Sequence, residues 1–429
     1  MDNTKKNLRI AMISEHADPL APLGGQQSGG QNVYVYELCK SLSKLGVAVD
    51  VFTRWDNRKA SQVVKFAKRA KVVRLKAGPR HFVPKDNFGP YMPEFVEKFL
   101  EYSRIKKVKY DLIHTNYYYS GWVGVQLKHI IHLPLVHTNH ALALSKIIGL
   151  KIPEETLGER LKIEKRVAKV ADKIISTSPQ EKINILKMEK GSEEKVSVVP
   201  AGVNFLRFKL ISKNKARKKL GLNERRKLIV FAGRMEKNKG GEVLIKSIVD
   251  IKKKNPEFFK NLGVFMFSGD PRKQYKKEKV ESNLRHQLTA IINHNKLEKV
   301  IKLSKGIDQE KLHYYFCAAN VVVVPSFYES FGLVAIEAMA CGTPVVASNV
   351  GGLKGTVHEG ITGFHARAGD AKGFAREIAK ILSDERLERR MGENAAIYAK
   401  NRYGWMGIAE KIVDIYQKVV ENSKSSEIK

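Results

Sequence analysis

The sequence predicts an α/β protein built from two doubly wound parallel-sheet domains. Short β-branched runs alternate with longer amphipathic segments along the chain, which is the pattern of βα units around parallel sheets. The chain has 429 residues, of which 43% are hydrophobic, so each of two domains can have its own core. The alternation is interrupted once, where residues 200–227 mix Pro, Gly and Asn with a basic run. We therefore place the junction between the domains near 203–223.

The expected strands follow from these runs. In the first half we expect them at residues 8–13, 47–52, 72–75, 112–115, 135–138, 173–176 and 196–199. In the second half we expect them at residues 228–232, 263–267, 300–303, 321–325 and 344–347. Ligands of such sheets bind at the carboxyl ends of the strands, where two such domains face each other. The residues that follow these runs are therefore the candidates for a functional site.

Cysteine usage and the amino terminus predict a soluble protein of a reducing compartment. The three cysteines, Cys39, Cys317 and Cys341, have neither the spacing of a disulfide framework nor C-x-x-C zinc spacing. We therefore expect reduced, packed thiols in a cytoplasm. The apolar run near the amino terminus ends at residues 14–16, which makes it too short for a secretory signal or a membrane span.

The formal net charge is +33, and much of it lies in runs such as 213–219, 250–256 and 272–280, which we expect to form solvated loops and helix ends. A charge of this size attracts anionic nucleotides, phosphorylated substrates, acidic lipids or nucleic acid. General solubility is the alternative interpretation. The sequence contains no homeodomain, zinc-finger or RNA-recognition pattern, so we expect no specific nucleic acid partner.

A candidate anion site lies in the segment PSFYESFGLVAIEAMACGTPVVAS, residues 325–348. After the strand we expect a loop and then a helix over about 332–341. Its amino terminus would offer the backbone amides of Phe331, Gly332 and Leu333 to an anion, because these amides have no partner within the helix.

The same segment keeps two glutamates, Glu329 and Glu337, among small and apolar residues. They are eight residues apart, which corresponds to only about 80° around a helix. Both carboxylates can therefore border one cleft. The alternative is that Glu337 faces solvent, although its neighbours leave almost no polar face on the helix.

This E-x7-E segment with FGL inside it closely resembles the signature of family 4 retaining glycosyltransferases. Further segments similar to that family are SGGQNVYVYELCKSLSKLGVAVDVFTR (28–54), VVPAGVN (198–204), FAGRMEKNKGG (231–241) and YGWMGIAEKIVDIY (403–416). The resemblance covers nearly the whole chain and is greatest to the branch of sucrose-phosphate synthase and inositol-phosphate N-acetylglucosaminyltransferase.

The resemblance implies the GT-B fold, in which two Rossmann-like domains face each other and a carboxyl-terminal helix crosses back to the first domain. The amino-terminal acceptor domain would comprise residues 1–205 together with the crossing helix, at about 405–422. The carboxyl-terminal domain, which binds the nucleotide-sugar donor in this family, would comprise residues 206–404.

Loss of a nucleoside diphosphate from a donor sugar develops negative charge on the leaving group and positive charge at the anomeric carbon. Arg234 and Lys239 follow an expected strand at a spacing that puts two cations beside the diphosphate, and ordinary surface cations are the alternative. By the resemblance, Glu337 binds the ribose hydroxyls and Glu329 the hydroxyls of the donor sugar. The resemblance also assigns Gly269, Gly306 and Ile307 to the donor cleft. The nucleotide base would lie near Gly306 and Ile307.

Two glycine pairs follow the first strand and let the backbone approach a phosphate or a sugar closely. We assign donor binding to Gly29 and Gly30, which directly precede a helix. A flexible surface loop is the alternative, above all for the pair at 24–25. A nicotinamide dinucleotide site would need G-x-G-x-x-G and an acid at the end of the second strand, where Arg54 stands. A dehydrogenase is therefore not expected.

The remaining candidates come from the resemblance. His140 matches the family histidine that contacts the donor sugar at the reaction centre, and a structural histidine is the alternative. Lys85, Tyr117 and Arg160 match residues that hold the phosphate of an acceptor, although Lys85 and Arg160 taken singly could be ordinary exposed cations. The small hydroxyl residue that follows the histidine in those relatives is Ala141 here, so one hydrogen bond to the acceptor is missing.

The sequence offers no committed nucleophile of the kind that a retaining glycosidase uses. The family is usually described as reacting on one face of the sugar, with the leaving phosphate helping to deprotonate the acceptor. There is also no Asp-x-Asp motif, which is consistent with phosphate charge being met by Arg, Lys and helix ends. We therefore expect no metal and no cofactor.

Three hypotheses follow for the function. The first is a cytoplasmic retaining glycosyltransferase that moves a hexosyl unit, glucosyl from UDP-glucose, to a phosphorylated small acceptor such as fructose 6-phosphate. The second is a transferase for lipid-linked or cell-envelope glycans, which its charge docks to the inner face of an anionic membrane. The third is a non-catalytic binder of nucleotide sugars or nucleic acid, which the complete set of donor residues disfavours.

Overall fold

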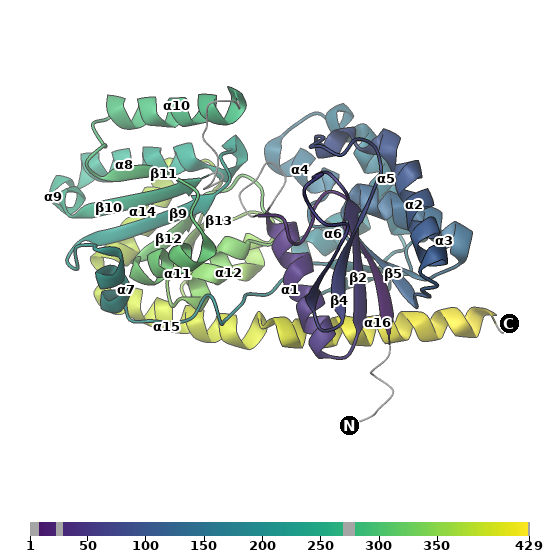
Figure 1. Ribbon diagram of the computed structural model, residues 1–429. Coiled ribbons are helices and arrows are strands. Elements are labelled where there is room, and N and C mark those ends of the chain that lie inside the picture. The colour runs from purple at the N-terminus through teal and green to yellow at the C-terminus, as the bar shows by residue number, and fades with distance from the viewer. Residues whose placement is uncertain (1–7, 23–28, 269–278, 428–429) are drawn as a thin grey trace. The chain divides into compact units, whose positions relative to one another are not determined.

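An eight-stranded sheet forms the centre of the first of two units into which the chain divides (Figure 1). The computed structural model describes residues 8–22, 29–268 and 279–427. Of these, residues 8–22, 29–201 and 405–427 form the first unit, and residues 202–268 and 279–404 form the second. The division at 201/202 compares with a boundary expected at 205/206.

The first sheet has the strand order β3-β4-β2-β1-β5-β6-β7-β8. Its strands are β1 (Arg9–Ile13), β2 (Ala48–Arg54), β3 (Val63–Ala67), β4 (Ala70–Leu75), β5 (Leu112–Asn116), β6 (Leu135–Thr138), β7 (Lys173–Ser176) and β8 (Val196–Val198). Neighbouring strands are parallel except β3, which pairs antiparallel with β4. The order reverses between β1 and β5, so the topological switch point lies where these two strands end.

Helices cover both faces of the first sheet. They are α1 (Gly30–Lys44), α2 (Met92–Ile105), α3 (Tyr118–Ile131), α4 (Ala143–Leu150), α5 (Gly158–Val170), α6 (Pro179–Met188) and α16 (Trp405–Glu427). Short 3-10 turns lie at Lys85–Asn87, Gly89–Tyr91 and Glu154–Leu157. Helices α2, α3 and α5 share one apolar core with the sheet.

The last helix, α16 (yellow in Figure 1), belongs to the first unit although it follows the second in sequence. It packs along α1, where the Trp405 ring lies 5.5 Å from the ring of Tyr34. The Tyr416 hydroxyl lies 2.5 Å from Nδ1 of His114 on β5, and both side chains are fully buried. Because apolar residues recur at helical spacing along its inner side, α16 completes the core of this unit.

The second sheet has six strands in the order β11-β10-β9-β12-β13-β14, all parallel. They are β9 (Lys227–Gly233), β10 (Leu262–Ser268), β11 (Ile301–Lys305), β12 (Val321–Val324), β13 (Val345–Ser348) and β14 (Gly363–Ala366). Here the order reverses between β9 and β12, which makes their carboxyl ends the second switch point.

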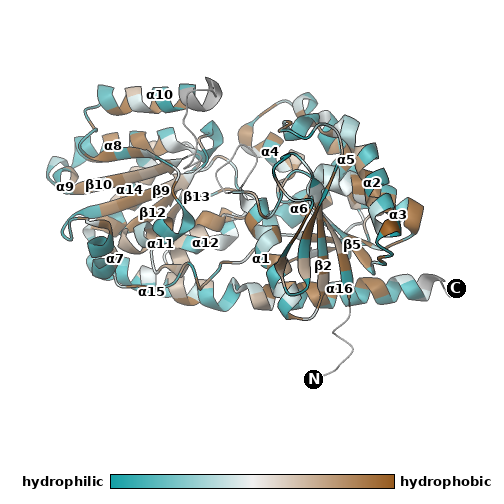
Figure 2. Ribbon diagram, in the orientation of Figure 1, coloured by the Kyte–Doolittle hydropathy of each residue, from teal (hydrophilic) through white to brown (hydrophobic). Residues whose placement is uncertain are grey.

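The helices of the second unit also lie on both faces of their sheet. They are α7 (Lys213–Leu220), α8 (Gly241–Lys254), α9 (Pro256–Lys260), α10 (Lys279–His294), α11 (Gln309–Ala318), α12 (Leu333–Ala340), α13 (Leu353–Thr356), α14 (Ala371–Ser383) and α15 (Glu385–Arg402). A 3-10 turn lies at Lys237–Lys239. In Figure 2 the strands β9, β10 and β12 are largely brown, because they are buried on both faces as strands of covered parallel sheets are.

Strands β3 and β14 were not predicted from the sequence, and helix α7 was assigned to the domain junction. Strand β3 (VVKFA) is only partly buried at the sheet edge, and β14 (GFHA) contains no β-branched residue, so neither has a long β-branched run. Helix α7 lies within the expected junction and buries only Ala216 and Arg217, which leaves no apolar stripe to detect. Its ends nevertheless carry local signals, because the Ser212 side chain caps one end and Gly221, with φ +64°, ends the other.

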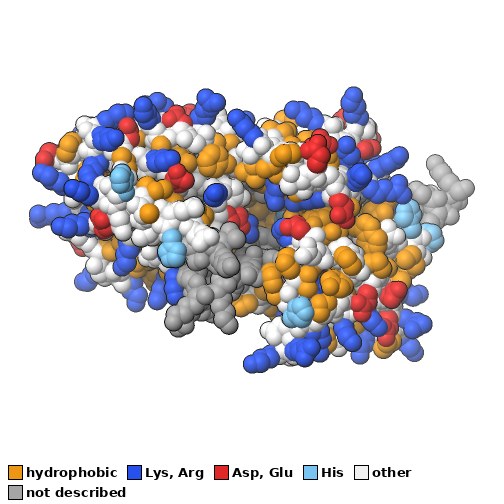
Figure 3. All heavy atoms as spheres, turned by 90° about the horizontal axis from the view of Figure 1, so that it is seen from above, with side chains coloured by type: hydrophobic (Ala, Val, Ile, Leu, Met, Phe, Trp, Pro, Cys, Tyr) orange, Lys and Arg blue, Asp and Glu red, His pale blue; other side chains and the backbone are white. Residues whose placement is uncertain are grey.

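The surface carries the positive charge over both units. Figure 3 shows Lys and Arg side chains spread along the outline of the visible face, with Asp and Glu between them. Among the residues that the structure describes, no helix combines the length and the apolar character needed to cross a bilayer.

Candidate active site

Two residues expected to act on the donor meet at the switch point of the second sheet. Lys239 ends the 3-10 turn that follows β9, and Glu329 lies in the loop after β12. Lys239 Nζ lies 2.7 Å from Glu329 Oε2, and each side chain is about one-fifth exposed. A largely buried but still accessible cation and carboxylate in one place can contact a phosphate and a sugar hydroxyl, respectively.

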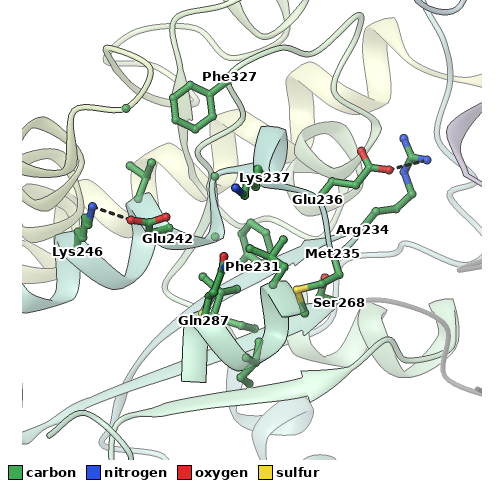
Figure 4. Close-up of a pocket in the computed structure, with 18 residues that line it drawn as sticks. Phe231, Arg234, Met235, Glu236, Lys237, Glu242, Lys246, Ser268, Gln287 and Phe327 are labelled. Carbon is green, nitrogen blue, oxygen red and sulfur yellow. Dashed lines mark ion pairs between the residues drawn. The ribbon is translucent and has the colours of Figure 1, made fainter. Parts of the chain in front are cut away.

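Arg234 follows β9 directly but has a different partner. Its Nη1 lies 2.9 Å from Glu236 Oε1, and 44% of its side chain is exposed. Figure 4 shows Arg234 and Glu236 directed toward each other at the edge of a cavity of about 330 Å³, with the Glu242–Lys246 ion pair at another edge. This cavity is lined from β9, α8 and α10 and is not bordered by Lys239 or Glu329. The guanidinium is therefore a solvent-accessible cation at the carboxyl end of β9.

The amino terminus of α12 has the backbone needed for the expected anion site. Gly332 precedes the helix with φ +101°, and a Cβ there would lie 2.6 Å from Leu353 Cδ2. Phe331 is buried with its ring 5.6 Å from the ring of Tyr403. Leu333 is the first helical residue. The positive φ turns the chain sharply, so that a buried aromatic residue can be followed at once by a helix with unpaired amides.

A glycine pair that was not among the predicted site residues supports this loop. Gly351 and Gly352 pack against the backbone of the Glu329 loop, and Gly352 N donates a hydrogen bond to Glu329 O at 2.9 Å. A Cβ on Gly351, whose φ is +46°, would lie 2.0 Å from that same oxygen. The sequence signal was available, since the motif NVGG, residues 349–352, follows the expected strand at 344–347 after a single serine.

Glu337 is buried, with 7% of the residue exposed, so the solvent-facing alternative is wrong. Burial raises the pKa of its carboxyl to about 8, and the charge of Arg207 opposes that rise. Within the described part of the chain, no side chain or amide donates a hydrogen bond to this carboxyl group. It is therefore available to accept bonds from the hydroxyl groups of a ligand.

Three further residues, Gly269, Gly306 and Ile307, were predicted to bind the donor. Gly306 and Ile307 lie half-buried in the loop between β11 and α11. Gly269 lies outside the residues that the structure describes. The assignment of these residues to the nucleotide stays a prediction.

In the first unit, His140 follows β6 with an unusual backbone and a fixed ring. Its φ is +60°, and Nε2 lies 2.8 Å from Asn116 Oδ1. Asn116 donates its amide hydrogens to Ile13 O and to Met12 Sδ, so its oxygen is the atom that faces the imidazole. Nε2 of His140 is therefore the protonated nitrogen, which leaves the lone pair on Nδ1.

Burial holds the pKa of His140 well below its usual range, and the neighbouring His114 and His137 lower it further. The imidazole is therefore neutral at physiological pH. Positive φ at a non-glycine residue costs free energy and occurs preferentially at functional sites. Tyr117, with φ +82°, shares this feature after the adjacent strand β5.

Gly29 and Gly30 are connected to the same region. Gly30 begins α1, and Gln31 donates from Nε2 to Asn116 O at 3.2 Å and to Ser14 Oγ at 3.1 Å. Gly29 has extended backbone, and among the described atoms none lies within 4 Å of a Cβ built on it. Its lack of a side chain is therefore not required by the protein's own packing.

The three acceptor candidates lie in one cluster. The Arg160 guanidinium donates to the Tyr117 hydroxyl at 2.7 Å, to Glu164 Oε1 at 2.7 Å and to the carbonyl oxygen of Ala141. Arg160 and Tyr117 are both buried, so Arg160 is not an ordinary exposed cation. Because it ties the turn after His140 to helix α5, Arg160 positions that turn whatever else it binds.

Lys85 joins this cluster through Asp86. Lys85 Nζ lies 2.7 Å from Asp86 Oδ2, and Asp86 Oδ1 accepts from the Tyr118 hydroxyl at 3.2 Å. The Arg160 guanidinium lies 4.9 Å from the centre of the Tyr118 ring. The Lys85 side chain is 27% exposed, so it can contact a solute at the edge of the cluster.

His16 also belongs to this region, although it was not among the predicted site residues. Its Nδ1 lies 2.8 Å from Glu15 Oε1, and its ring lies 4.8 Å from the ring of Tyr117. It also contributes to lowering the pKa of His140. Its position three residues after the end of the first strand was the available signal, because switch-point ligands are contacted from there.

Comparison with known proteins identifies the family. A model of Glycosyltransferase Family 4 matches residues 28–206, and a model of Glycosyl transferases group 1 matches residues 212–397. Over 419 residues the chain is 32% identical to the D-inositol 3-phosphate glycosyltransferase of Corynebacterium glutamicum (strain R), covering 97% of this chain and 98% of that protein. It is 33% identical over 421 residues to D-inositol 3-phosphate glycosyltransferase 2 of Catenulispora acidiphila, covering 97% of this chain and 96% of that one.

Among solved structures, it is similar to the sucrose-phosphate synthase of Thermosynechococcus elongatus, with 34% identity and a TM-score of 0.87 over 97% of this chain and 100% of that one. This similarity agrees with the two Rossmann-like sheets described above. The chain therefore belongs to the family 4 glycosyltransferases of the GT-B fold and is a transferase enzyme.

Proposed function

We propose that this enzyme is a retaining glycosyltransferase that moves a glucosyl unit from UDP-glucose to a phosphorylated small acceptor such as fructose 6-phosphate. The observation that carries the donor side is the Lys239–Glu329 pair, which joins the ends of β9 and β12 at 2.7 Å. A departing diphosphate and a donor sugar are the two groups that need a cation and a hydrogen-bond acceptor in one place.

In this proposal the second unit stabilises the leaving group. Lys239, Arg234 and the amides at the start of α12 meet the negative charge that develops as the glycosidic bond to phosphate breaks. Glu329 orients the sugar through its hydroxyls. Glu337, whose buried carboxyl accepts no bond from the described residues, receives the ribose hydroxyls.

His140 contributes a neutral imidazole to the sugar side. Because Nε2 donates to Asn116, Nδ1 can accept a hydrogen bond from a sugar hydroxyl. The neutral ring adds no positive charge beside an anomeric carbon that is itself becoming positive. We propose that the acceptor hydroxyl attacks on the face from which the diphosphate leaves and passes its proton to a phosphate oxygen, so the configuration is retained.

The acceptor proposal rests on the cluster of Lys85, Tyr117 and Arg160 and on the names of the relatives. D-inositol 3-phosphate and sucrose phosphate both appear in those names. Arg160 is buried and already bonded to Tyr117, Glu164 and Ala141, whereas the Lys85 side chain is 27% exposed. We therefore assign direct contact with the acceptor phosphate to Lys85. Arg160 holds Tyr117 and the turn after His140 in place.

A donor and acceptor array read by mass spectrometry tests the proposal. We expect transfer from UDP-glucose to fructose 6-phosphate and none to fructose. Lys85→Ala should raise the KM for the phosphorylated acceptor by about tenfold or more, because a charge-assisted hydrogen bond is lost. Lys98→Ala, which removes an exposed lysine of α2 paired with Glu101, is the matched control and should leave that KM unchanged. Preference for unphosphorylated acceptors would reject the proposal.

Inositol 3-phosphate is the second candidate acceptor, favoured by the names of two relatives. The same array separates it from fructose 6-phosphate, because each acceptor is offered in a separate reaction. For either acceptor we propose that no divalent ion meets the diphosphate, because Arg234 and Lys239 supply two positive charges. Transfer should then continue when EDTA is added to the assay.

A further inference from the structure

Three potential metal ligands converge inside the second unit, at the end of α12 that is remote from Glu329. His313 and Cys317 are four residues apart on α11, so they lie on one face of that helix. Cys341 directly follows the last residue of α12. One ring nitrogen and the two sulfurs lie within 4.8 Å of one another, and all three residues are buried.

A backbone oxygen from a third segment reaches the same point. The carbonyl oxygen of Lys209 lies 2.7 Å from Nε2 of His313 and 3.5 Å from Sγ of Cys317. Two sulfurs, one imidazole nitrogen and one carbonyl oxygen are four donors, the number that zinc takes in its tetrahedral sites. With a Zn–S distance of about 2.3 Å, the sulfurs of such a site are about 3.8 Å apart, so small side-chain shifts bring these donors to bonding distance.

We propose that His313, Cys317 and Cys341 bind one Zn²⁺ ion, with the carbonyl oxygen of Lys209 as the fourth donor. Soft thiolate ligands select zinc over magnesium and calcium, which prefer oxygen. Binding converts two thiols to thiolates and releases two protons, so the resulting complex of Zn²⁺ with two thiolates has no net charge. A neutral complex is the form that a buried site tolerates best.

A disulfide between the two cysteines would explain less of this geometry. It would use only the sulfurs and would need neither the imidazole nor the carbonyl group beside them. The metal instead accounts for all four groups, and it joins α11, α12 and the segment that contains Lys209. It takes no part in the proposed transfer reaction. Its role is to fix the carboxyl end of the helix whose amino end forms the anion site.

Cobalt titration of the full-length, reduced chain tests this site. The protein is first stripped with a chelator under reducing conditions and then titrated with Co²⁺. We expect one equivalent to bind with a thiolate-to-cobalt charge-transfer absorption, which one equivalent of Zn²⁺ displaces. Cys317→Ser and Cys341→Ser should lose that absorption. Cys39→Ser, which changes the buried cysteine of α1, is the matched control and should keep it.

Because a buried substitution can also unfold the second unit, the wild-type chain provides a second measurement. Its Tm should rise with Zn²⁺ and not with the same concentration of Mg²⁺. The proposal is overturned if the wild-type chain binds no Co²⁺ or if the absorption persists in Cys317→Ser. It is also overturned if peroxide removes two titratable thiols from a chain that binds no metal, since that result would assign a disulfide.

Discussion

Substitution of Glu329 should lower the rate of transfer without weakening the binding of UDP. Glu329→Gln keeps the size of the side chain but removes the charge that holds Lys239 and weakens the hydrogen bonds proposed for the donor sugar. We expect most transfer activity to be lost, while the affinity for UDP stays the same or rises slightly because Lys239 is released to the diphosphate. Initial rates and calorimetry with UDP measure the two effects.

The matched control for that variant is Glu242→Gln, which removes a carboxylate paired with Lys246 on the exposed face of α8. It should change neither quantity. If Glu329→Gln weakened UDP as strongly as it lowered the transfer rate, the residue would belong to the nucleotide rather than to the sugar.

Glu337 should make the stability of the enzyme depend on pH. Its pKa is about 8 in the folded protein and 4.5 without burial, so the folded state holds a proton that the unfolded chain releases between these values. The contribution of Glu337 to the free energy of unfolding is therefore fully present below pH 4.5 and is lost as the pH rises toward 8, by up to about 1.4 kcal/mol for each pH unit. Glu337→Gln removes this contribution.

The measurement is chemical denaturation of wild type and Glu337→Gln at several pH values. Other titrating groups are common to both proteins, so they cancel in the difference between the two. We expect Glu337→Gln to gain stability relative to wild type as the pH rises from 5 to 8. Parallel curves for the two proteins would show that the carboxyl group is ionised in the folded state at neutral pH.

Some residues of the candidate site could be proposed from sequence, and others could not. Lys239 and Glu329 follow apolar runs in a parallel sheet, and topology alone brings such positions together. The positive φ angles of Tyr117 and His140 have no sequence signal, because only a small fraction of either residue type adopts that conformation. The burial of Arg160 was also hidden, since a lysine- and arginine-rich segment predicts exposure.

At the scale of elements, the two glycine sites should respond differently to a methyl group. Gly332 precedes α12 with φ +101°, and a methyl group added there would lie 2.6 Å from Leu353 Cδ2, so Gly332→Ala should disturb the helix start and lower the Tm. Gly29 has extended backbone and no described atom within 4 Å of such a position. Gly29→Ala should therefore leave the Tm unchanged.

If Gly29 approaches the donor as proposed, Gly29→Ala should still lose transfer activity. Thermal unfolding and initial rates of both variants provide the comparison, with wild type as reference. An unchanged transfer rate in Gly29→Ala would remove this glycine from the donor site and leave it as part of a surface turn.

Strands with apolar runs were predicted well, and the missed elements share a physical cause. The strand expected at 135–138 and that at 173–176 coincide with β6 and β7, because each contains a short apolar run that the sheet buries. β3 and α7 gain their stability from edge pairing and caps rather than from burial. Periodicity therefore could not reveal them. The ligands of the proposed zinc site have no C-x-x-C spacing, because H-x-x-x-C on a helix and a cysteine from a second helix meet only in the folded chain.

The whole molecule carries a formal charge of +33, and this charge should act on anionic substrates from a distance. Salt shortens the screening length from about 10 Å at 0.1 M to about 3 Å at 1 M. We expect the association rate constant for UDP to fall over this range and its dissociation rate constant to change much less. Stopped-flow binding measures both, and uridine, which has no charge, is the control.

The membrane hypothesis makes a different use of the same charge. Sedimentation with vesicles that contain an anionic lipid should show no binding at physiological salt if the spread of Lys and Arg in Figure 3 only steers small substrates. Binding to anionic but not to neutral vesicles, abolished by salt, would instead favour an acceptor at a membrane surface.

The return of α16 to the first unit has a consequence for biosynthesis. The bond between His114 and Tyr416 spans 302 residues of sequence, so the second unit is in effect an insertion within the first. During synthesis on the ribosome, the amino-terminal sheet cannot be completed until every residue of the insertion has been made. Until then, the surface that α16 later covers stays exposed. A chain released early, anywhere before residue 405, would keep that apolar face open to chaperones and proteases, and incomplete molecules would be marked for removal.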